Sequence, residues 1–390
     1  MSRTPVAPSG CGGRRGVRSV RQRNFTVRGT GSGHTGNMTS DTSDRTVLYG
    51  ISSRAWEHPA DRGALVAVRK LRGFDMVVRR LSALVTERAV RLMLLGSAIR
   101  VDERQFTRLH DVYTEACTVL DVEQVPELYV VANPFLNAQT IGLDKPVIVV
   151  NSALLYALDD DELRFVLGHE LGHVASGHAV YRTILLLLTT LSTTFLSIPL
   201  GGLGLRAIMA ALTEWYRKSE LSGDRAGLLA CQDPDAALRV HMKLASGGDA
   251  SQLSQEAFLD QAVAYHEDED IRDLVLRALV VETMSHPFAV ARAGELRRWV
   301  SSGEYALVIA GSYPRREDDA KANISAETAA AAASYTDQFA KAEQTIDQAL
   351  KDLFGGIGSM GSRVTDFLRG PARTDSPTAT DEPDGPPPSW

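Results

Sequence analysis

The stretch His169-Glu170-Leu171-Gly172-His173 carries the strongest structural signal in this chain. On a helix, residues four apart lie about 40° apart around the axis, so both histidines project from one face. Two imidazoles so arranged can hold one metal ion, and Glu170 is placed to polarise a metal-bound water. This is the His-Glu-x-x-His pattern of zinc proteases, in which zinc takes three protein ligands and keeps one position open for water. The pattern therefore predicts a helix here and a third ligand elsewhere.

The next histidine, His178, does not fit as that third ligand. If the helix continued, His178 would point about 140° away from His173 and about 180° away from His169. The pattern with a third histidine needs glycine three residues and histidine six residues after the second histidine. Ser176 and Ala179 stand at those positions. We therefore interpret His178 as an ordinary polar residue near the end of the helix.

Glu220 fits better as the third ligand. The segment 215–231 has few helix breakers, so we expect a helix on which Asp224 lies one turn after Glu220. A metal-bound histidine usually donates its second ring N–H to a carboxylate, and Asp224 is placed to accept it. The sequence thus predicts His169, His173 and Glu220 as metal ligands, with Asp224 orienting one histidine. A solvated helix face is the alternative for Glu220 and Asp224.

Around these motifs the chain resembles the zinc metallopeptidases of the HtpX and CAAX prenyl protease type, which are gluzincins. The resemblance runs from about residue 126 to residue 296. It rests on residues 126–130, 137–138, 142, 146–151, 161–163, 177–178, 219–220, 224–225, 286–287 and 292, together with the histidine motif. It implies one Zn²⁺ per chain and a role for His286 in stabilising an oxyanion, although His286 could also be a turn residue before proline. The chain departs from the family at Gly223, where alanine is more usual.

Motif and resemblance together predict a zinc-dependent metalloendopeptidase that acts on polypeptide substrates, with Glu170 as general base. A role in protein quality control is one further hypothesis. The competing class is a non-catalytic module that keeps a structural zinc and interacts through a C-terminal amphipathic helix. Glu170 argues against that class, because a structural site needs no base. The sequence reveals neither a specificity pocket nor an oligomeric state.

The bulk composition limits the remaining possibilities. A chain of 390 residues with 44% hydrophobic residues has room for one large or two ordinary domains and a real core. Its net charge of −6 gives no general case for nucleic-acid binding. Three widely spaced cysteines do not suggest a disulfide framework. We expect a cytoplasmic location without a signal peptide, with membrane association as the open alternative.

The first 45 residues differ from the rest. Residues 1–37 hold seven arginines and no acid, so this part carries +7 and the remainder −13. The segment is rich in Gly, Ser and Thr, which predicts a disordered arm. We favour an inert arm upstream of a natural start at Met38, with a nucleic-acid or membrane arm and a targeting segment as alternatives.

The pattern along the chain predicts an α+β, mostly α-helical fold: a zincin-like metallopeptidase with a small antiparallel sheet and an active-site helix. Strands are expected at 128–131, 139–141 and 147–150, and the acids at 159–162 should begin the active-site helix. The peptidase domain should span 46–310. A linker with amphipathic helices should follow at 311–370, and a disordered tail at 371–390. The stretch 137–142 is a candidate edge strand for substrate, or a hairpin serving only the core.

An uncharged stretch at 183–205 is long enough to cross a bilayer. A single crossing would place His169 and His173 on one side of the membrane and Glu220 on the other. Two crossings need about 40 apolar residues, and only 183–212 is available. We therefore expect a helical hairpin there, either buried or in peripheral contact with a membrane. The C-terminal helix is a second candidate for such contact.

Overall fold

The computed structural model describes residues 45–71, 73–82, 87–194, 203–267, 288–321 and 328–337. All of them belong to one compact unit, Arg45–Trp390, and the other unit, Met1–Asp44, lies outside the described residues. The predictions for the basic arm, Met38, His286 and residues 338–390 also fall outside the described residues.

Most described residues are helical, as predicted. The helices are α1 (Pro59–Arg69), α2 (Phe74–Ser82), α3 (Glu87–Ser97), α4 (Thr107–Val119), α5 (Ser152–Ala157), α6 (Asp160–Ala175), α7 (Ala179–Thr194), α8 (Leu203–Cys231), α9 (Pro234–Ser246), α10 (Gln255–Glu267), α12 (Ala289–Ser301) and α13 (Glu304–Ile309). Short 3₁₀ helices cover Ser53–Ala55 and Arg316–Lys321.

The sheet is mixed, whereas the sequence predicted an antiparallel one. Its order is β1 (Ile99–Arg100), β2 (Leu128–Val131), β4 (Val147–Asn151) and β3 (Ala138–Ile141). The pairs β1–β2 and β3–β4 are antiparallel, but β2 and β4 are parallel. The reason is that β3 goes to the sheet edge and β4 returns between β2 and β3. Consecutive strands β2 and β3 are therefore not neighbours.

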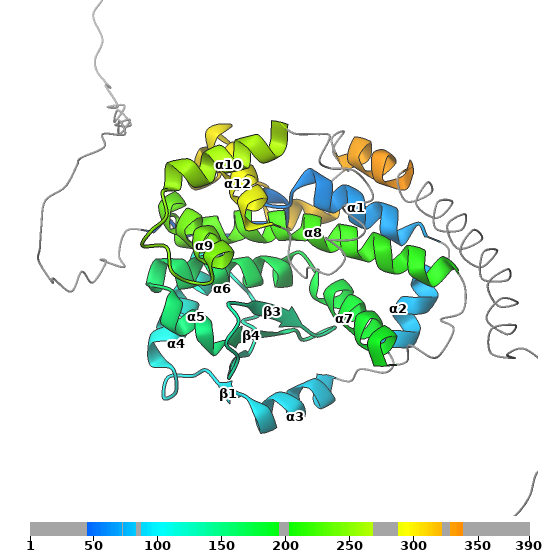
Figure 1. The fold of residues 1–390 in the computed structure, drawn as a ribbon. Coiled ribbons are helices and arrows are strands. Elements are labelled where there is room, and N and C mark those ends of the chain that lie inside the picture. Colours follow the sequence, from blue (N-terminus) through cyan, green and yellow to red (C-terminus); the bar gives the residue numbers. More distant parts are fainter. Residues whose placement is uncertain are drawn as a thin grey trace, which may run out of the picture. The chain divides into compact units, whose positions relative to one another are not determined.

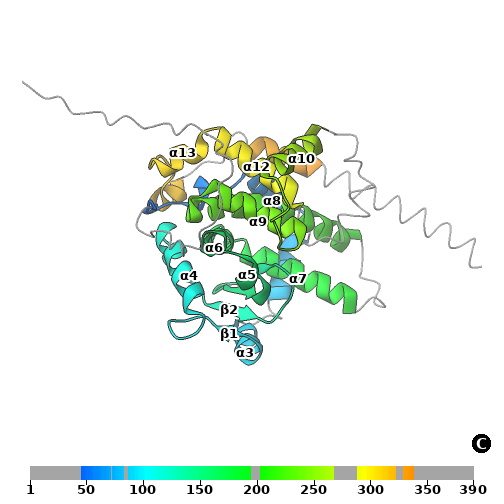
Figure 2. The ribbon, with the colours of Figure 1, turned by 60° about the vertical axis from the view of Figure 1, so that its left-hand side comes forward.

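Strand β4 is buried along its whole length. Ile148 and Val150 join the main core with α4 and α6, while Val147 and Val149 face Leu94 of α3. A continuous Val/Ile run is typical of a strand covered on both faces. Figures 1 and 2 accordingly show α6 on one side of the sheet and α3 on the other.

Helix α6 lies between the sheet and α8, and small residues bring these two helices close together (Figures 1 and 2). A Cβ at Gly168 would collide with Ala230, and one at Gly172 would collide with Ala226. The backbones can approach because these positions lack side chains. This close contact sets the residues of α8 directly against the histidine motif of α6.

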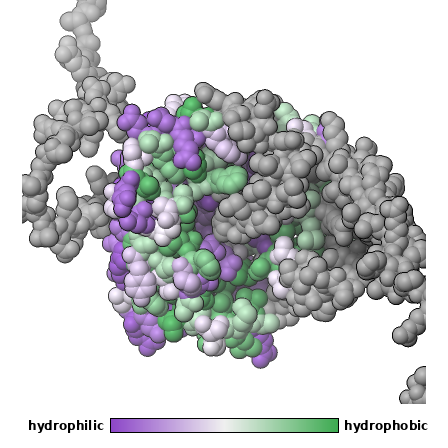
Figure 3. Space-filling model, in the orientation of Figure 1, coloured by the Kyte–Doolittle hydropathy of each residue, from purple (hydrophilic) through white to green (hydrophobic). Residues whose placement is uncertain are grey.

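A second hydrophobic cluster unites α1, α2, α7 and the first half of α8 around Trp215. The stretch expected to form a hairpin gives α7 and the start of α8. Among the described residues, no helix is both long and apolar enough to cross a membrane. The face seen in Figure 3 mixes hydrophilic and apolar surface.

Described residues after 311 fold back onto the beginning of the unit. Arg315 forms a β-bridge with Ile51, and Asp319 accepts a hydrogen bond of 2.6 Å from Ser52. Residues 328–337 are helical and place Ala331 against Gly63 of α1. At least this part of the segment expected to be a linker packs on the peptidase core.

Candidate active site

Helix α6 begins with a capping box that fixes its start. The Asp159 carboxylate accepts from the Glu162 backbone N–H at 2.9 Å, and the Glu162 carboxylate accepts from that of Asp159 at 2.9 Å. Asp160 and Asp161 complete an acidic first turn that interacts favourably with the helix dipole. The helix start predicted from these acids is confirmed.

His169 and His173 of α6 meet Glu220 of α8 in the protein interior. Their donor atoms all lie within 4.8 Å of one another, and all three side chains are buried. The two Nε2 atoms are 3.0 Å apart, and each lies 3.5 Å from a Glu220 oxygen. Ligands about 2.0–2.2 Å from a tetrahedral ion are separated by about 3.3–3.6 Å. The two nitrogen–oxygen distances match this range and the nitrogen–nitrogen distance falls slightly below it, so the N, N, O donor set is compatible with a zinc ion.

Two buried arginines surround Glu220. Arg182 Nη1 lies 2.7 Å from one carboxylate oxygen, and Arg292 Nη1 lies 3.1 Å from the other. Burial opposes ionisation, but the guanidinium groups of Arg292 and Arg182 hold the pKa of Glu220 well below its usual value. Arg182 Nη1 is also 2.5 Å from His173 Nε2. Burial and Arg182 together lower the pKa of His173 well below its usual value, which favours the neutral imidazole that a metal needs.

Asp224 lies beside the other histidine. Its Oδ1 is 3.1 Å from His169 Nδ1, and Arg292 donates two hydrogen bonds to the same carboxylate, of 2.7 and 2.5 Å. Burial opposes protonation of His169, but hydrogen bonds to Asp224 and Glu220 raise its pKa to about 9. A metal at Nε2 would therefore displace a proton. A Cβ at Gly223 would come within 2.5 Å of the His169 ring, which gives a local reason for glycine at this position.

His178 is not an ordinary polar residue at the helix end, and that interpretation was wrong. It is buried, its Nδ1 lies 3.0 Å from His173 Nδ1, and its Nε2 lies 3.1 Å from Asp61 of α1. The angles of about 140° and 180° hold only for a helix that continues to His178. Instead α6 ends at Ala175, and Gly177 turns the chain back with a φ of 68°.

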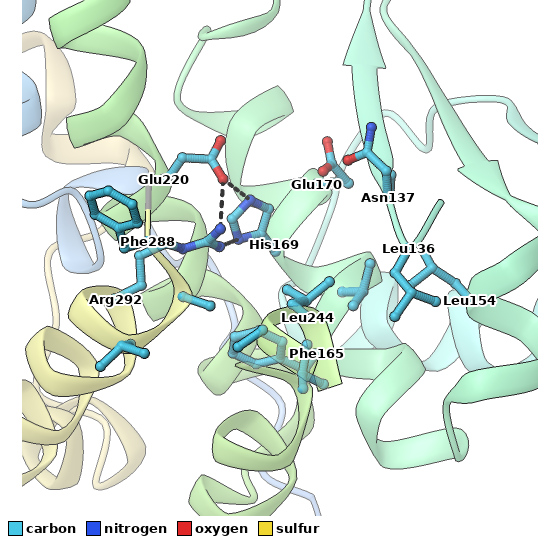
Figure 4. A pocket seen from close by; sticks show the side chains of 16 residues that line it. Leu136, Asn137, Leu154, Phe165, His169, Glu170, Glu220, Leu244, Phe288 and Arg292 are labelled. Atoms are coloured by element: carbon cyan, nitrogen blue, oxygen red, sulfur yellow. Dashed lines mark hydrogen bonds and ion pairs between the residues drawn. The ribbon is translucent and has the colours of Figure 1, made fainter. Parts of the chain in front are cut away.

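Glu170 lines a pocket of about 400 Å³ beside the cluster. The Thr140 hydroxyl of β3 lies 2.7 Å from Glu170 Oε2 and donates to it. Figure 4 shows His169, Glu220 and Arg292 together at one side of the pocket, with apolar side chains farther along it. The apolar lining residues are Leu136, Ala138, Leu154, Phe165, Val166, Val240, Leu244, Ala245, Phe288, Ala289 and Val290.

Among the described residues, strand β3 forms an edge of the sheet next to this pocket. The Asn151 N–H bonds the Asn137 carbonyl, so the alternation of an antiparallel ladder turns the backbone groups of Ala138 and Thr140 away from β4. Gly142 is the next residue in this alternation whose backbone groups point away from β4. Its N–H and carbonyl are both bonded to the Thr183 hydroxyl, at 3.0 and 3.1 Å. Pairing at this edge therefore stops at Gly142.

Sequence reasoning missed Asp61, His178, Arg182 and Thr140 as neighbours of the cluster. Gly177 was a usable signal for His178, because glycine after a helix often reverses the chain. Asp61, Arg182 and Thr140 approach from α1, α7 and β3, and the sequence offers no local signal that their side chains reach the cluster. His241 of α9 is also buried, with its Nε2 3.7 Å from Asp224 Oδ2, and neither of its ring nitrogens has a hydrogen-bond partner among the described residues.

Comparison with known proteins agrees with this geometry. The family model described as peptidase family M48 matches residues 103–300, about half of the chain. The chain belongs to peptidase family M48. The resemblance inferred from the motifs is thereby confirmed, and the family identifies the chain as a metallopeptidase.

Individual M48 relatives extend the match. The chain is 35% identical to the plastoglobule-localized metallopeptidase 48 of Arabidopsis thaliana over 255 residues, 64% of this chain and 73% of that protein. It is 39% identical to the protease HtpX of Shewanella pealeana over 64 residues, 16% of this chain and 22% of that protein. It is 31% identical to an HtpX homologue of Methanosarcina acetivorans over 108 residues, 27% and 36% of the two chains. No solved structure matches the chain.

Proposed function

We propose that this M48 metallopeptidase is a zinc-dependent endopeptidase with one Zn²⁺ held by His169, His173 and Glu220. The observation that carries the proposal is the buried group of two imidazoles and one carboxylate, whose donor atoms lie within 4.8 Å of one another beside a cleft that also contains Glu170. Zinc bound there supplies a Lewis acid for the scissile carbonyl and lowers the pKa of a bound water.

The side chains around the cluster then have separate tasks. Glu170 takes the proton of the attacking water and passes it to the leaving amine. Asp224 accepts the Nδ1 proton of His169 and so leaves Nε2 free for the metal. His286 remains a proposal for the oxyanion partner, carried by the resemblance alone.

The substrate is a polypeptide that lies along β3. Ala138 and Thr140 offer outward backbone N–H and carbonyl groups, so an extended peptide can add as a further strand. Thr183 occupies the next position at Gly142, which limits strand pairing to a few residues. Such main-chain recognition suits an endopeptidase that accepts unfolded segments of varied sequence.

Zinc content and cleavage test the proposal together. Elemental analysis should give about one zinc per wild-type chain and much less in Glu220→Ala. Cleavage of an unfolded, fluorescently labelled protein should stop with a chelator and return with added zinc. Unchanged zinc in Glu220→Ala would remove Glu220 from the ligand set. Zinc without cleavage would favour the structural-zinc alternative, whose C-terminal helix lies outside the described residues.

We also propose peripheral membrane contact through residues 183–212. The Arabidopsis relative is named for its plastoglobule location, and Leu186 of α7 is 45% exposed. Wild-type protein should float with anionic liposomes in a density gradient, and Leu186→Glu should float less. Equal behaviour of the two proteins, or no flotation, would contradict this contact. The cytoplasmic location stays a prediction.

A further inference from the structure

A sharp turn at the end of α6 decides where His178 lies. The His178 N–H donates to the His173 carbonyl at 3.0 Å, and the Gly177 N–H donates to that of Val174 at 3.1 Å. With Gly177 in the left-handed region, this pair of bonds is the Schellman motif, which folds the chain back against the last helical turn. The motif places the His178 ring next to the His173 ring, with the two Nδ1 atoms 3.0 Å apart.

On its other side His178 meets the carboxylate of Asp61. That carboxylate also accepts the indole N–H of Trp215 at 2.8 Å and the hydroxyl of Ser222 at 2.6 Å, both from α8. Asp61, Trp215, Ser222 and His178 are all buried. A buried carboxylate is costly without partners, so these contacts hold Asp61 in one position.

If His173 binds a metal through Nε2, the hydrogen bonds among Asp61, His178 and His173 permit only one placement of the protons. An ionised carboxylate only accepts, so His178 Nε2 donates to Asp61. A neutral imidazole carries one N–H, so His178 Nδ1 accepts. His173 Nδ1 must then donate, which leaves the lone pair of His173 on Nε2. That atom is the one that faces His169 and Glu220.

We propose that Asp61 and His178 are positioning residues that fix the tautomer and ring orientation of His173 through the hydrogen-bond chain Asp61–His178–His173. The proposal rests on the proposed function, in which His173 binds the metal. His169 is oriented directly by its hydrogen bond to Asp224. His173 is connected to the carboxylate of Asp61 through the imidazole of His178. That imidazole comes from the turn after α6, whereas Asp224, the partner of His169, comes from α8.

Two substitutions at His178 separate hydrogen bonding from packing. His178→Leu fills the space but cannot accept from His173 Nδ1. His178→Asn places a carbonyl oxygen near the former Nδ1 and keeps the acceptor. Zinc affinity, measured by competition with a chelator, should fall about 10–100-fold in His178→Leu and be largely restored in His178→Asn. The visible spectrum of the cobalt-loaded protein should change in the leucine variant, because the ring of one ligand is no longer held.

Asp61 tests whether the effect travels along the chain of hydrogen bonds. Asp61→Asn keeps the side-chain size but weakens the acceptor, and should lower zinc affinity about three- to tenfold, less than His178→Leu. In a His178→Leu background the same substitution should have no effect on zinc affinity, because the connection to His173 is gone. An equal effect in both backgrounds would mean that Asp61 acts through Trp215 and Ser222, and would overturn the proposal.

Leu188→Ala, on α7 just after His178 and in the second hydrophobic cluster, is the control for lost packing. It should lower the unfolding midpoint without changing zinc affinity. If His178→Leu does not fold, the His178→Asn background serves for the Asp61 comparison, since asparagine cannot bridge to Asp61. Wild-type zinc affinity and cobalt spectrum in His178→Leu would overturn the proposal. If His173→Ala leaves zinc binding intact, the proposed function itself is wrong.

Discussion

The two ends of the cleft are built on opposite principles. At the metal end every buried charge has a fixed partner: Glu220 lies between Arg182 and Arg292, and Asp224 between Arg292 and His169. At the other end the lining is mostly apolar. Charges in a buried network depend on one another, whereas apolar contacts depend mainly on size and shape. Substitutions should therefore abolish function at the first end and redirect it at the second.

The largest effect on turnover at unchanged zinc content is expected at Glu170. Glu170→Gln keeps the shape of the side chain but removes the base, so kcat should fall by about 10²–10⁴-fold while zinc content stays near one per chain. Steady-state cleavage of a quenched fluorescent peptide measures the first quantity and elemental analysis the second. Wild-type turnover in this variant would end the assignment of Glu170 as base.

The next largest effect is expected at Glu220, because this residue is the proposed third ligand and also belongs to the charge network. Glu220→Ala removes a ligand and leaves the Arg182 and Arg292 guanidinium groups without their carboxylate. Breaking a buried ion pair in this way costs about 3–5 kcal/mol, so the free energy of unfolding should fall by that amount together with the loss of zinc. Urea unfolding of the metal-free protein measures the loss of the ion pairs separately from the loss of zinc.

Glu214 provides the matched control for that measurement. It lies on the same helix and pairs with Arg217 and Lys218 near the surface. Glu214→Ala should change the free energy of unfolding by less than about 1 kcal/mol, since exposed pairs contribute little. Equal losses in the two variants would contradict the view that the interior network, rather than helix charge in general, stabilises the metal end.

The same contrast explains what the sequence could predict. The histidine motif, its acidic helix start and the later helix carrying Glu220 all follow from spacing along one segment, and the structure brings these residues together. His178 was misjudged because helical angles were extended past a glycine that ends the helix. Arg182, Asp61 and Thr140 reach the cluster from α7, α1 and β3. Tertiary packing determines which polar residues contact the site, so no local sequence pattern predicts these three.

At the apolar end, substitution should change preference rather than turnover. The pocket begins beside Glu170, which serves the leaving amine, so we expect it to take a large apolar side chain just after the scissile bond. Leu244→Trp narrows the pocket and should lower cleavage before leucine or phenylalanine relative to alanine about 10–100-fold, with zinc content unchanged. Mass spectrometry of products from a peptide mixture measures the preference.

Leu253→Trp is the control for this experiment, because Leu253 is exposed and does not line the pocket. Its cleavage pattern should equal that of the wild type. If the wild-type enzyme shows no preference for apolar residues after the scissile bond, the pocket does not select the substrate. That result would not affect the roles proposed for the metal-end residues. Loss of zinc in Leu244→Trp would instead show that the two ends are coupled.

The smallest effect is expected at Thr140, where strand and base meet. Its hydroxyl donates to Glu170 Oε2, so it restrains the direction of the carboxylate without carrying charge itself. Thr140→Val has nearly the same shape and should reduce kcat about tenfold, equivalent to about 1.4 kcal/mol, at unchanged KM and zinc content. Thr183→Val is the matched control: it removes another buried hydroxyl beside β3, but one bonded to Gly142 rather than to Glu170. Reduced kcat in Thr140→Val alone means that the edge strand orients the base, whereas wild-type kcat in both variants means that α6 holds Glu170 by itself and β3 serves only the substrate.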